Sequence, residues 1–334
     1  MPNYRVISSD NHVFEPADLW TSRVQPKFRD RAPRVVRLEG AGEMWVCEGK
    51  NVVGPVAGAE TGERFETPEA TGRAHAMSDL RPGGYIPEEH VKDMDIDGVD
   101  MSIVYPTFGL LIYCQPLDDD LLNDIFRSYN DWLAEFCQPF PDRLKGIANI
   151  NVDDVDSAVQ ELERSANLGL IGALIPVHLG EHKRYDSPEF ERLWAASQDL
   201  QIPLGLHSAT NRPGPLNEWS GANNTGLSAA FFTQLDHWVR MSLSDIIFSG
   251  VFERYPKLQI GVVEHELGWI PHFLDRMDYT YTQRPFGALG WYRFKENMLP
   301  SDYFHRNVFV GFQEDALGIE LRNLIGVDNL MWGS

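Results

Sequence analysis

The feature that most constrains the fold is a series of short, continuously apolar segments that recurs along the chain. Longer segments with apolar residues at helical spacing lie between them. A strand that is buried on both faces is apolar throughout, and parallel strands need a crossover connection, usually a helix. The pattern therefore predicts a parallel sheet covered by helices. The candidate strands are Tyr4–Ser9, Met101–Tyr105, Leu144–Ile150, Gly172–Val177, Ile202–His207, Leu258–Val263, Asn307–Gly311 and Asn329–Gly333.

The number of candidate strands favours a barrel over an open sheet. Eight strands with intervening helices match the (β/α)8 barrel, and helical patterns cover about residues 87–97, 116–140, 154–168, 187–200, 227–255, 269–281 and 313–325. A doubly wound sheet is the rival, but it usually has fewer strands and a glycine-rich turn after the first. Here the first candidate strand runs into Asp10-Asn11-His12. We predict an α/β fold, a TIM barrel that forms one metal-dependent domain over residues 1–334.

A long insertion interrupts this alternation after the first strand, at about residues 13–86. Within it, Glu43–Cys47 and Asn51–Val53 flank Glu48-Gly49-Lys50, which is typical of a β-hairpin. An insertion at this point of a barrel emerges at the catalytic face, which favours a lid or an oligomer contact. A solvent-exposed excursion without a role is the alternative.

Charge and composition narrow the classes of partner. The 29 Lys and Arg against 49 Asp and Glu give a net charge of −20, which disfavours binding to nucleic acids and anionic membranes. No apolar run is long enough to span a bilayer, and no signal peptide is evident at the start. The 3 cysteines have no CxxC spacing, which favours reduced thiols and a cytoplasmic location.

Polar residues at the ends of candidate strands mark the predicted site. Barrel enzymes carry their chemistry at the carboxyl ends of the strands. Asp10 and His12 follow the first strand and share one face because they are two residues apart. His207 ends the fifth strand and His265 follows the sixth. One such histidine is more often structural, but three of them with a carboxylate nearby indicate a divalent metal site.

Motifs along nearly the whole chain give the sequence a recognisable pattern. It resembles the amidohydrolase-related family of the amidohydrolase superfamily, in the branch that includes aminocarboxymuconate semialdehyde decarboxylase and the benzoate-type decarboxylases. The matching segments, in order, are Val6–Pro16, Gly98–Asp100 with Tyr105–Thr107, Phe140–Leu144, Phe248–Leu258, Gly268–Pro271 with Arg276–Asp278, and Met331–Ser334. The resemblance is specific for the family and says little about the substrate.

The resemblance implies roles for individual residues. Asp10, His12 and His207 match the metal ligands, and His265 matches the histidine that activates water or moves a proton in decarboxylases. The implied cofactor is one divalent ion, zinc or manganese; a carboxylate at position 10 instead of the usual histidine or glutamate could favour manganese or magnesium over zinc. The family also has an Asp after the eighth-strand Gly-Ser. Because the sequence stops at Ser334, we expect that Asp and a barrel-closing segment beyond the end.

Further residues and functions remain as alternatives. His178, Asn211 and Arg212 are candidates for contact with a substrate carboxylate, and Glu264 is assigned a structural role. The predicted function is non-oxidative decarboxylation of a small aromatic or dienoic carboxylate by a homodimer or higher homo-oligomer. The alternatives are hydrolysis of an amide, lactone or ester at the same site, and a catalytically silent binding or scaffold protein.

Overall fold

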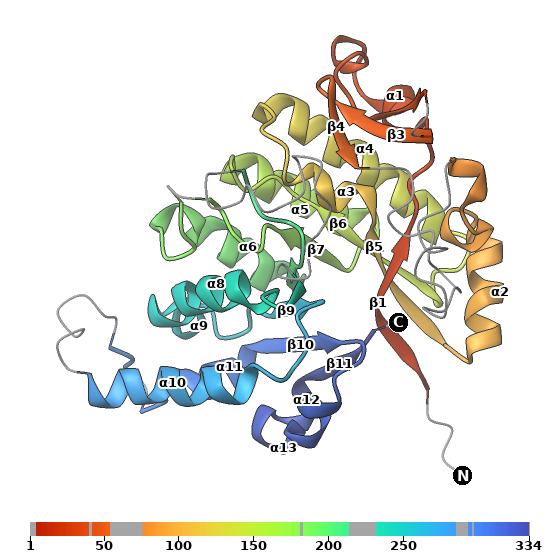
Figure 1. Cartoon of the computed structure of the whole chain (residues 1–334). Helices are drawn as coiled ribbons and strands as arrows, with labels where there is room; N and C mark the ends of the chain where they lie inside the picture. Colours follow the sequence, from red (N-terminus) through yellow and green to blue (C-terminus); the bar gives the residue numbers. More distant parts are fainter. Residues whose placement is uncertain are drawn as a thin grey trace.

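Eight parallel strands curl into a nearly closed barrel (Figure 1) in the order β1-β5-β6-β7-β8-β9-β10-β11. The computed structural model describes residues 5–39, 42–53, 76–180, 183–213, 232–284, 293–295 and 297–333. Each predicted strand is present, so the TIM-barrel prediction is confirmed. The strands are β1 (Ile7–Val13), β5 (Met101–Pro106), β6 (Leu144–Asn149), β7 (Gly172–Ile175), β8 (Leu204–His207), β9 (Ile260–Val263), β10 (Val308–Phe312) and β11 (Leu330–Trp332).

The barrel closes between its first and last strands through specific contacts. Ser9 Oγ donates a hydrogen bond to the Trp332 carbonyl at 2.9 Å. A Cβ on Gly333 would stand only 2.6 Å from Asp10 Cβ, so this approach requires glycine. The described chain accordingly ends beside β1 (Figure 1), and the backbone around Asp10 is held by both neighbouring strands.

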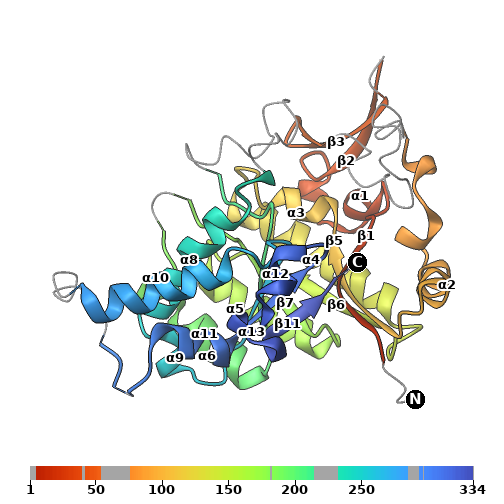
Figure 2. The same cartoon turned by 60° about the horizontal axis from the view of Figure 1, so that its bottom comes forward.

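Amphipathic helices surround the strands (Figure 2). The predicted helix over residues 313–325 is instead two short helices. The predicted helix over 227–255 breaks at Gly250, whose φ is 76°. Residues 227–231 of that prediction lie outside the described residues. The helix over 300–307 was not predicted. The helices are α1 (Leu19–Arg23), α2 (Pro87–Asp97), α3 (Phe108–Ile112), α4 (Asp119–Cys137), α5 (Val155–Asn167), α6 (Glu191–Leu200), α8 (Asp236–Phe248), α9 (Val251–Arg254), α10 (Ile270–Gln283), α11 (Pro300–Asn307), α12 (Ala316–Glu320) and α13 (Arg322–Ile325), with 3-10 turns at Pro26–Phe28, Met77–Asp79, Pro82–Gly84, Pro188–Phe190 and Val327–Asn329.

The insertion after β1 forms a small antiparallel sheet at the carboxyl end of that strand. The predicted hairpin is present as β3 (Gly42–Cys47) and β4 (Lys50–Val53), and β2 (Arg34–Leu38) adds a third strand. The buried Trp45 ring packs edge-on against Trp20, with 5.1 Å between ring centroids. It also packs, in a tilted arrangement, against Phe108 at 5.0 Å. The sheet is therefore packed onto the barrel through an aromatic cluster. Residues 54–75 of the predicted insertion lie outside the described residues.

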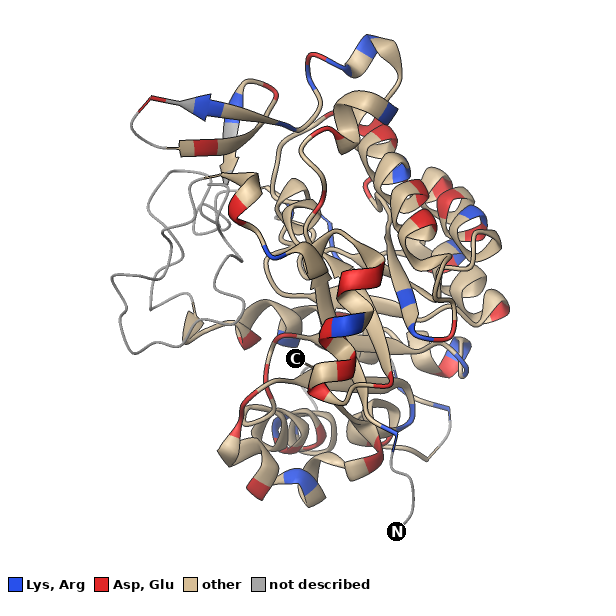
Figure 3. Ribbon diagram, turned by 90° about the vertical axis from the view of Figure 1, so that its right-hand side faces the viewer, with Lys and Arg blue, Asp and Glu red and all other residues tan. Residues whose placement is uncertain are grey.

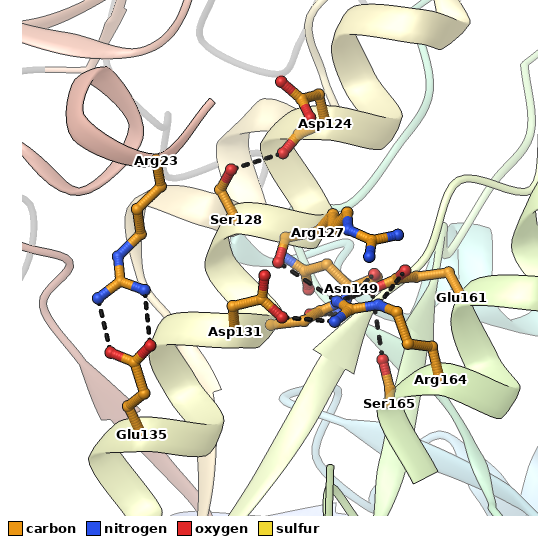
Figure 4. Close-up of polar contacts among 11 residues, drawn as sticks. Arg23, Asp124, Arg127, Ser128, Asp131, Glu135, Asn149, Glu161, Arg164 and Ser165 are labelled. Atoms are coloured by element: carbon orange, nitrogen blue, oxygen red, sulfur yellow. Dashed lines mark hydrogen bonds and ion pairs between the residues drawn. The ribbon is translucent and has the colours of Figure 1, made fainter. Parts of the chain in front are cut away.

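A polar network, here called the α4–α5 bracket, fixes the end of β6 (Figure 4). It consists of Asn130, Asp131, Glu161 and Arg164. Asn130 Oδ1 accepts from the Asn149 N–H at 2.8 Å, and its Nδ2 donates to the Asn149 carbonyl at 2.9 Å and to Glu161 at 2.7 Å. Arg164 donates to both Glu161 and Asp131. The bracket thus supplies the backbone partners that β6 lacks at its end.

Acidic residues outnumber basic ones in the chain, with 49 Asp and Glu against 29 Lys and Arg. Asp and Glu are spread over several helices in Figure 3, interleaved with Lys and Arg. Cys47, Cys114 and Cys137 are buried and form no disulfide with one another. Among the helices that the structure describes, none is both long enough and apolar enough to cross a membrane.

Candidate metal centre

Two predicted metal ligands, Asp10 and His12, lie within the first strand, whereas the sequence analysis placed them after its end. β1 extends through Val13, so Asp10 and His12 are strand residues. The β1–β5 register shifts between Ser8 and Asn11, which marks a bulge next to Asp10. Bulges commonly redirect side chains at functional sites. Here the bulge and the two-residue spacing bring both side chains to one point at the barrel mouth.

His207, the last residue of β8, completes this cluster. Asp10 Oδ1 lies 3.4 Å from His12 Nε2 and 3.6 Å from His207 Nε2. Ligands about 2.1 Å from a tetrahedral ion lie roughly 3.4 Å from one another, so these separations fit a shared cation. The structure brings Asp10, His12, His207 and Glu264 together, with one possible ligand atom from each lying within 4.8 Å of the others. The chain therefore has a four-residue group that can hold one divalent metal ion.

The hydrogen bonds of the two histidines prepare them for a cation. His12 Nδ1 faces the Pro106 carbonyl at 2.7 Å, and His207 Nδ1 faces the Ser208 carbonyl at 3.0 Å. Because a carbonyl only accepts, each Nδ1 carries a proton, and Nε2 is the nitrogen that presents a lone pair once the ring is neutral. Asp10 Oδ1 and both Nε2 atoms are buried without a hydrogen-bond partner. Buried acceptors converging in this way fit a metal ion, and the carbonyls serve as the supporting partners typical of metal-binding histidines.

Glu264 is the member of the group that the sequence analysis missed. Its Oε1 lies 3.8 Å from His12 Nε2, and its Oε2 accepts from Ser208 Oγ at 2.6 Å. Its backbone is left-handed, with φ of 59°, an uncommon conformation for a non-glycine residue that often marks functional sites. Its place directly after β9 was visible in the sequence, but the backbone conformation that directs it to the centre was not.

The cluster strongly perturbs its own ionisation. Burial by itself would raise the pKa of Asp10. The neighbouring His12 and His207 outweigh burial and lower the pKa of that carboxyl well below its usual range. Asp10 in turn raises the pKa of His12 to about 9 despite burial. The pKa of His207 is also raised, because the Glu264 and Asp10 carboxylates outweigh burial. The centre thus attracts positive charge, either protons or a metal ion.

His265 lies beside this group but is not one of its four members. Its Nδ1 donates to the Leu235 carbonyl at 2.9 Å, and its Nε2 is buried without a hydrogen-bond partner. Burial, reinforced by the charge of His207, lowers the pKa of His265 to about 3. His265 is therefore neutral at physiological pH, with one ring nitrogen fixed by the backbone.

The three predicted substrate-binding residues are buried in the loops after β7 and β8. Arg212 uses Nε and Nη2 to bind Asp153, at 2.9 and 2.5 Å, and Nη1 to bind the Tyr113 carbonyl at 2.5 Å. His178 accepts from the Gly180 N–H at 3.1 Å and packs on Trp238, at 4.3 Å between ring centroids. Asn211 is 3% exposed. The contacts of Arg212 favour a structural role in holding the loop.

His178 also borders a cavity of about 340 Å³ beside α8. Arg184, Ser242 and Asp245 line the same cavity. Contact of His178 with a substrate remains a prediction, since its ring faces this cavity as well as Trp238.

Comparison with known proteins identifies the relatives of the chain. Residues 70–334 match the family model for amidohydrolases. A gamma-resorcylate decarboxylase from Rhodococcus jostii is 30% identical over 241 residues, which cover 63% of this chain and 65% of that protein. The chain thus spans just under two thirds of the length of this curated relative.

Solved structures share the whole fold. An amidohydrolase from Mycobacterium avium subsp. paratuberculosis superposes with a TM-score of 0.78 at 21% identity, over 100% of this chain and 89% of that chain. A dihydroxybenzoic acid decarboxylase from Polaromonas sp., with bound manganese and the inhibitor 2-nitroresorcinol, gives 0.63 at 21% identity, over 98% and 85%. At this identity the likeness establishes a common barrel fold.

Proposed function

The chain belongs to the amidohydrolase family, and from this premise we propose that it is a metal-dependent carboxy-lyase that decarboxylates a small aromatic carboxylate. The observation that carries the proposal is the convergence of three buried atoms. Asp10 Oδ1 lies 3.4 Å from His12 Nε2 and 3.6 Å from His207 Nε2, and none of the three has a hydrogen-bond partner. A relative that is 30% identical over 241 residues is a gamma-resorcylate decarboxylase, and a decarboxylase structure of the same fold carries manganese.

In this proposal Asp10, His12 and His207 hold the ion, with Glu264 as a fourth ligand. A divalent ion held by these residues would supply Lewis acidity for a substrate carboxylate and for the charge that develops as the C–C bond breaks. Two carboxylate oxygens beside two imidazoles form a relatively hard ligand set, which supports manganese over zinc. The proposed cofactor is therefore one Mn²⁺ ion.

His265 handles the proton that replaces CO₂. The electrons of the broken C–C bond remain on the ring carbon, which then takes one proton, so that R–COO⁻ and H⁺ give R–H and CO₂. Because His265 Nδ1 is fixed on the Leu235 carbonyl, its Nε2 is the atom that accepts and returns this proton. Burial keeps the ring neutral before the substrate arrives and excludes bulk water from the step.

A planar substrate suits the walls of the centre. The ring of Tyr105, on β5, lies 5.3 Å from that of His207 and 6.2 Å from that of His12 between centroids. Aromatic rings at such separations favour packing of a further ring. A bound metal ion would offset the negative charge of the chain for an anionic substrate.

A parallel assay of two reactions tests the proposed function. Protein loaded with Mn²⁺ is assayed for CO₂ release from 2,6-dihydroxybenzoate and other carboxylated phenols, and for hydrolysis of lactones and amides. We expect CO₂ release that disappears in the His207→Ala variant. Hydrolysis without CO₂ release would instead support the hydrolase alternative, and an inactive, metal-free protein would support the silent scaffold. A homo-oligomer and a cytoplasmic location remain predictions.

A further inference from the structure

A buried carboxylate outside the metal group connects β1 to the first turn of α3. Glu15 is fully buried and lies three residues after His12. Its Oε2 accepts from the Phe108 N–H at 2.9 Å, and its Oε1 accepts from the Gly109 N–H at 2.8 Å. Two charge-assisted hydrogen bonds from consecutive amides fix both the position and the orientation of that peptide segment.

The same segment carries the carbonyl that orients His12. Pro106, two residues before Phe108, is the acceptor at 2.7 Å from His12 Nδ1. This hydrogen bond fixes the tautomer that turns the Nε2 lone pair towards Asp10 Oδ1, 3.4 Å away. Glu15 therefore acts on His12 through the short link from Phe108 back to Pro106.

Packing around this link leaves it little freedom. A Cβ on Gly109 would stand 2.9 Å from Glu15 Oε1 and 2.9 Å from Pro106 Cβ, so the close approach requires glycine. The Phe108 ring packs against Trp45 at 5.0 Å and against Phe14 at 6.2 Å between centroids. The segment is thus held by Glu15 on one side and by aromatic rings on the other.

Burial makes a charged carboxylate at Glu15 energetically unfavourable. Burial raises the pKa of Glu15 to about 7, and the N–H groups of Phe108 and Gly109 offset the burial only in part. A neutral side chain of the same shape would avoid this desolvation cost. An ionisable group held here against that cost is better explained by a role in the site than by packing.

We propose that Glu15 is a positioning residue of the metal centre, which holds the Pro106 carbonyl in place and so keeps His12 Nε2 directed at the ion. The inference rests on the proposed function, because it requires the centre to bind a metal. The inference adds to the centre a carboxylate that a search for metal ligands would not find, because Glu15 is not one of the four grouped residues.

The test measures Mn²⁺ affinity and folding stability of Glu15→Gln against the unchanged protein. The amide retains one acceptor, so one of the two N–H groups faces a donor. We expect Mn²⁺ affinity to fall about 10- to 100-fold, the range typical of supporting partners of metal ligands. The urea midpoint of the metal-free protein should fall no further than in the control variant, because each change removes one acceptor from a backbone N–H group. The matched control is Asp124→Asn: Asp124 is also buried and accepts from the Gln25 N–H at 2.7 Å, but it lies on α4 outside the centre. The Mn²⁺ affinity of the Asp124→Asn variant should equal that of the unchanged protein.

Gly109→Ala provides a second route to the same result. The added Cβ displaces the Glu15 carboxylate without changing any charge, so Mn²⁺ affinity should again fall about 10-fold or more. If either folded variant binds Mn²⁺ as tightly as the unchanged protein, the inference is overturned. If the unchanged protein itself binds no Mn²⁺, the proposed function fails first.

A spectroscopic measurement on the protein with Glu15 unchanged completes the test. Nitrogen-15 NMR of the zinc-loaded protein, with the His12 signals identified by comparison with His12→Gln, reports which ring nitrogen carries the proton. The inference predicts protonated Nδ1, on the Pro106 carbonyl. A proton on Nε2 would overturn it.

Discussion

The metal centre and the α4–α5 bracket both bring charged groups together between packed elements, but they differ in how the hydrogen bonds of those groups are satisfied. In the bracket, Arg164 binds both Glu161 and Asp131, and Asn130 uses both ends of its amide. In the centre, Asp10 Oδ1 and His12 Nε2 face each other with no hydrogen-bond partner. A polar network that serves the fold satisfies itself, whereas one that serves function leaves places for a ligand.

The largest expected effect separates the proton-transfer step from metal binding. His265→Asn should lower turnover about 10²- to 10⁴-fold, the usual contribution of a general acid–base group. Metal content should stay the same, because His265 is not one of the four grouped residues. Steady-state CO₂ release and elemental analysis of the same sample provide the two readings. A variant that turns over normally would remove His265 from the mechanism.

Glu264→Gln sharpens the comparison within the centre. We expect Mn²⁺ affinity to fall about 10-fold, because an amide oxygen is a weaker ligand than a carboxylate for a hard cation. Glu266→Gln is a close control, since Glu266 shares the left-handed backbone, with φ of 54°, but lies outside the group. Calorimetric titration compares the two variants. Equal affinities in both would mean that Glu264 is not a ligand.

The pH dependence of metal binding follows from the raised pKa of His12, about 9. Below that pH the imidazole holds a proton that a metal must displace, so affinity rises with pH and levels off above it. Competition by one proton gives about a tenfold gain per pH unit. Titrations with Mn²⁺ between about pH 6 and 8 measure this slope. A flat profile would exclude His12 from the ligands.

The smallest effect on the centre is expected from the bracket. Arg164→Met removes the cationic partner of Glu161 and Asp131 in a partly exposed place, where the side chain of Arg164 is 22% exposed. The free energy of unfolding should fall by about 1–3 kcal/mol in urea titrations. Metal affinity should stay within about twofold of the original, because the bracket is self-contained. A large loss of affinity would show that the two clusters are coupled.

The sequence predicted the strands well because a strand buried on both faces is apolar along its length. It misplaced the end of β1, since Asp10 and His12 are polar residues that point inward from within the strand. The bulge at Asp10 leaves no mark in the residue types.

The site was predictable only where a residue's position along a strand decides its role. Asp10, His12 and His207 could be found in this way. Glu15 could not, because its partner amide at Phe108 is 93 residues away. The contact of Arg212 with Asp153 could not be predicted either, because the two residues are 59 positions apart.

The most direct test of the account is the position and number of manganese ions in the protein. Crystals grown with Mn²⁺ should show one anomalous peak per chain, between Asp10 Oδ1, His12 Nε2 and His207 Nε2, and Asp10→Asn should abolish it. An active protein whose manganese lies elsewhere, or whose Asp10→Asn variant keeps the peak, would contradict the account.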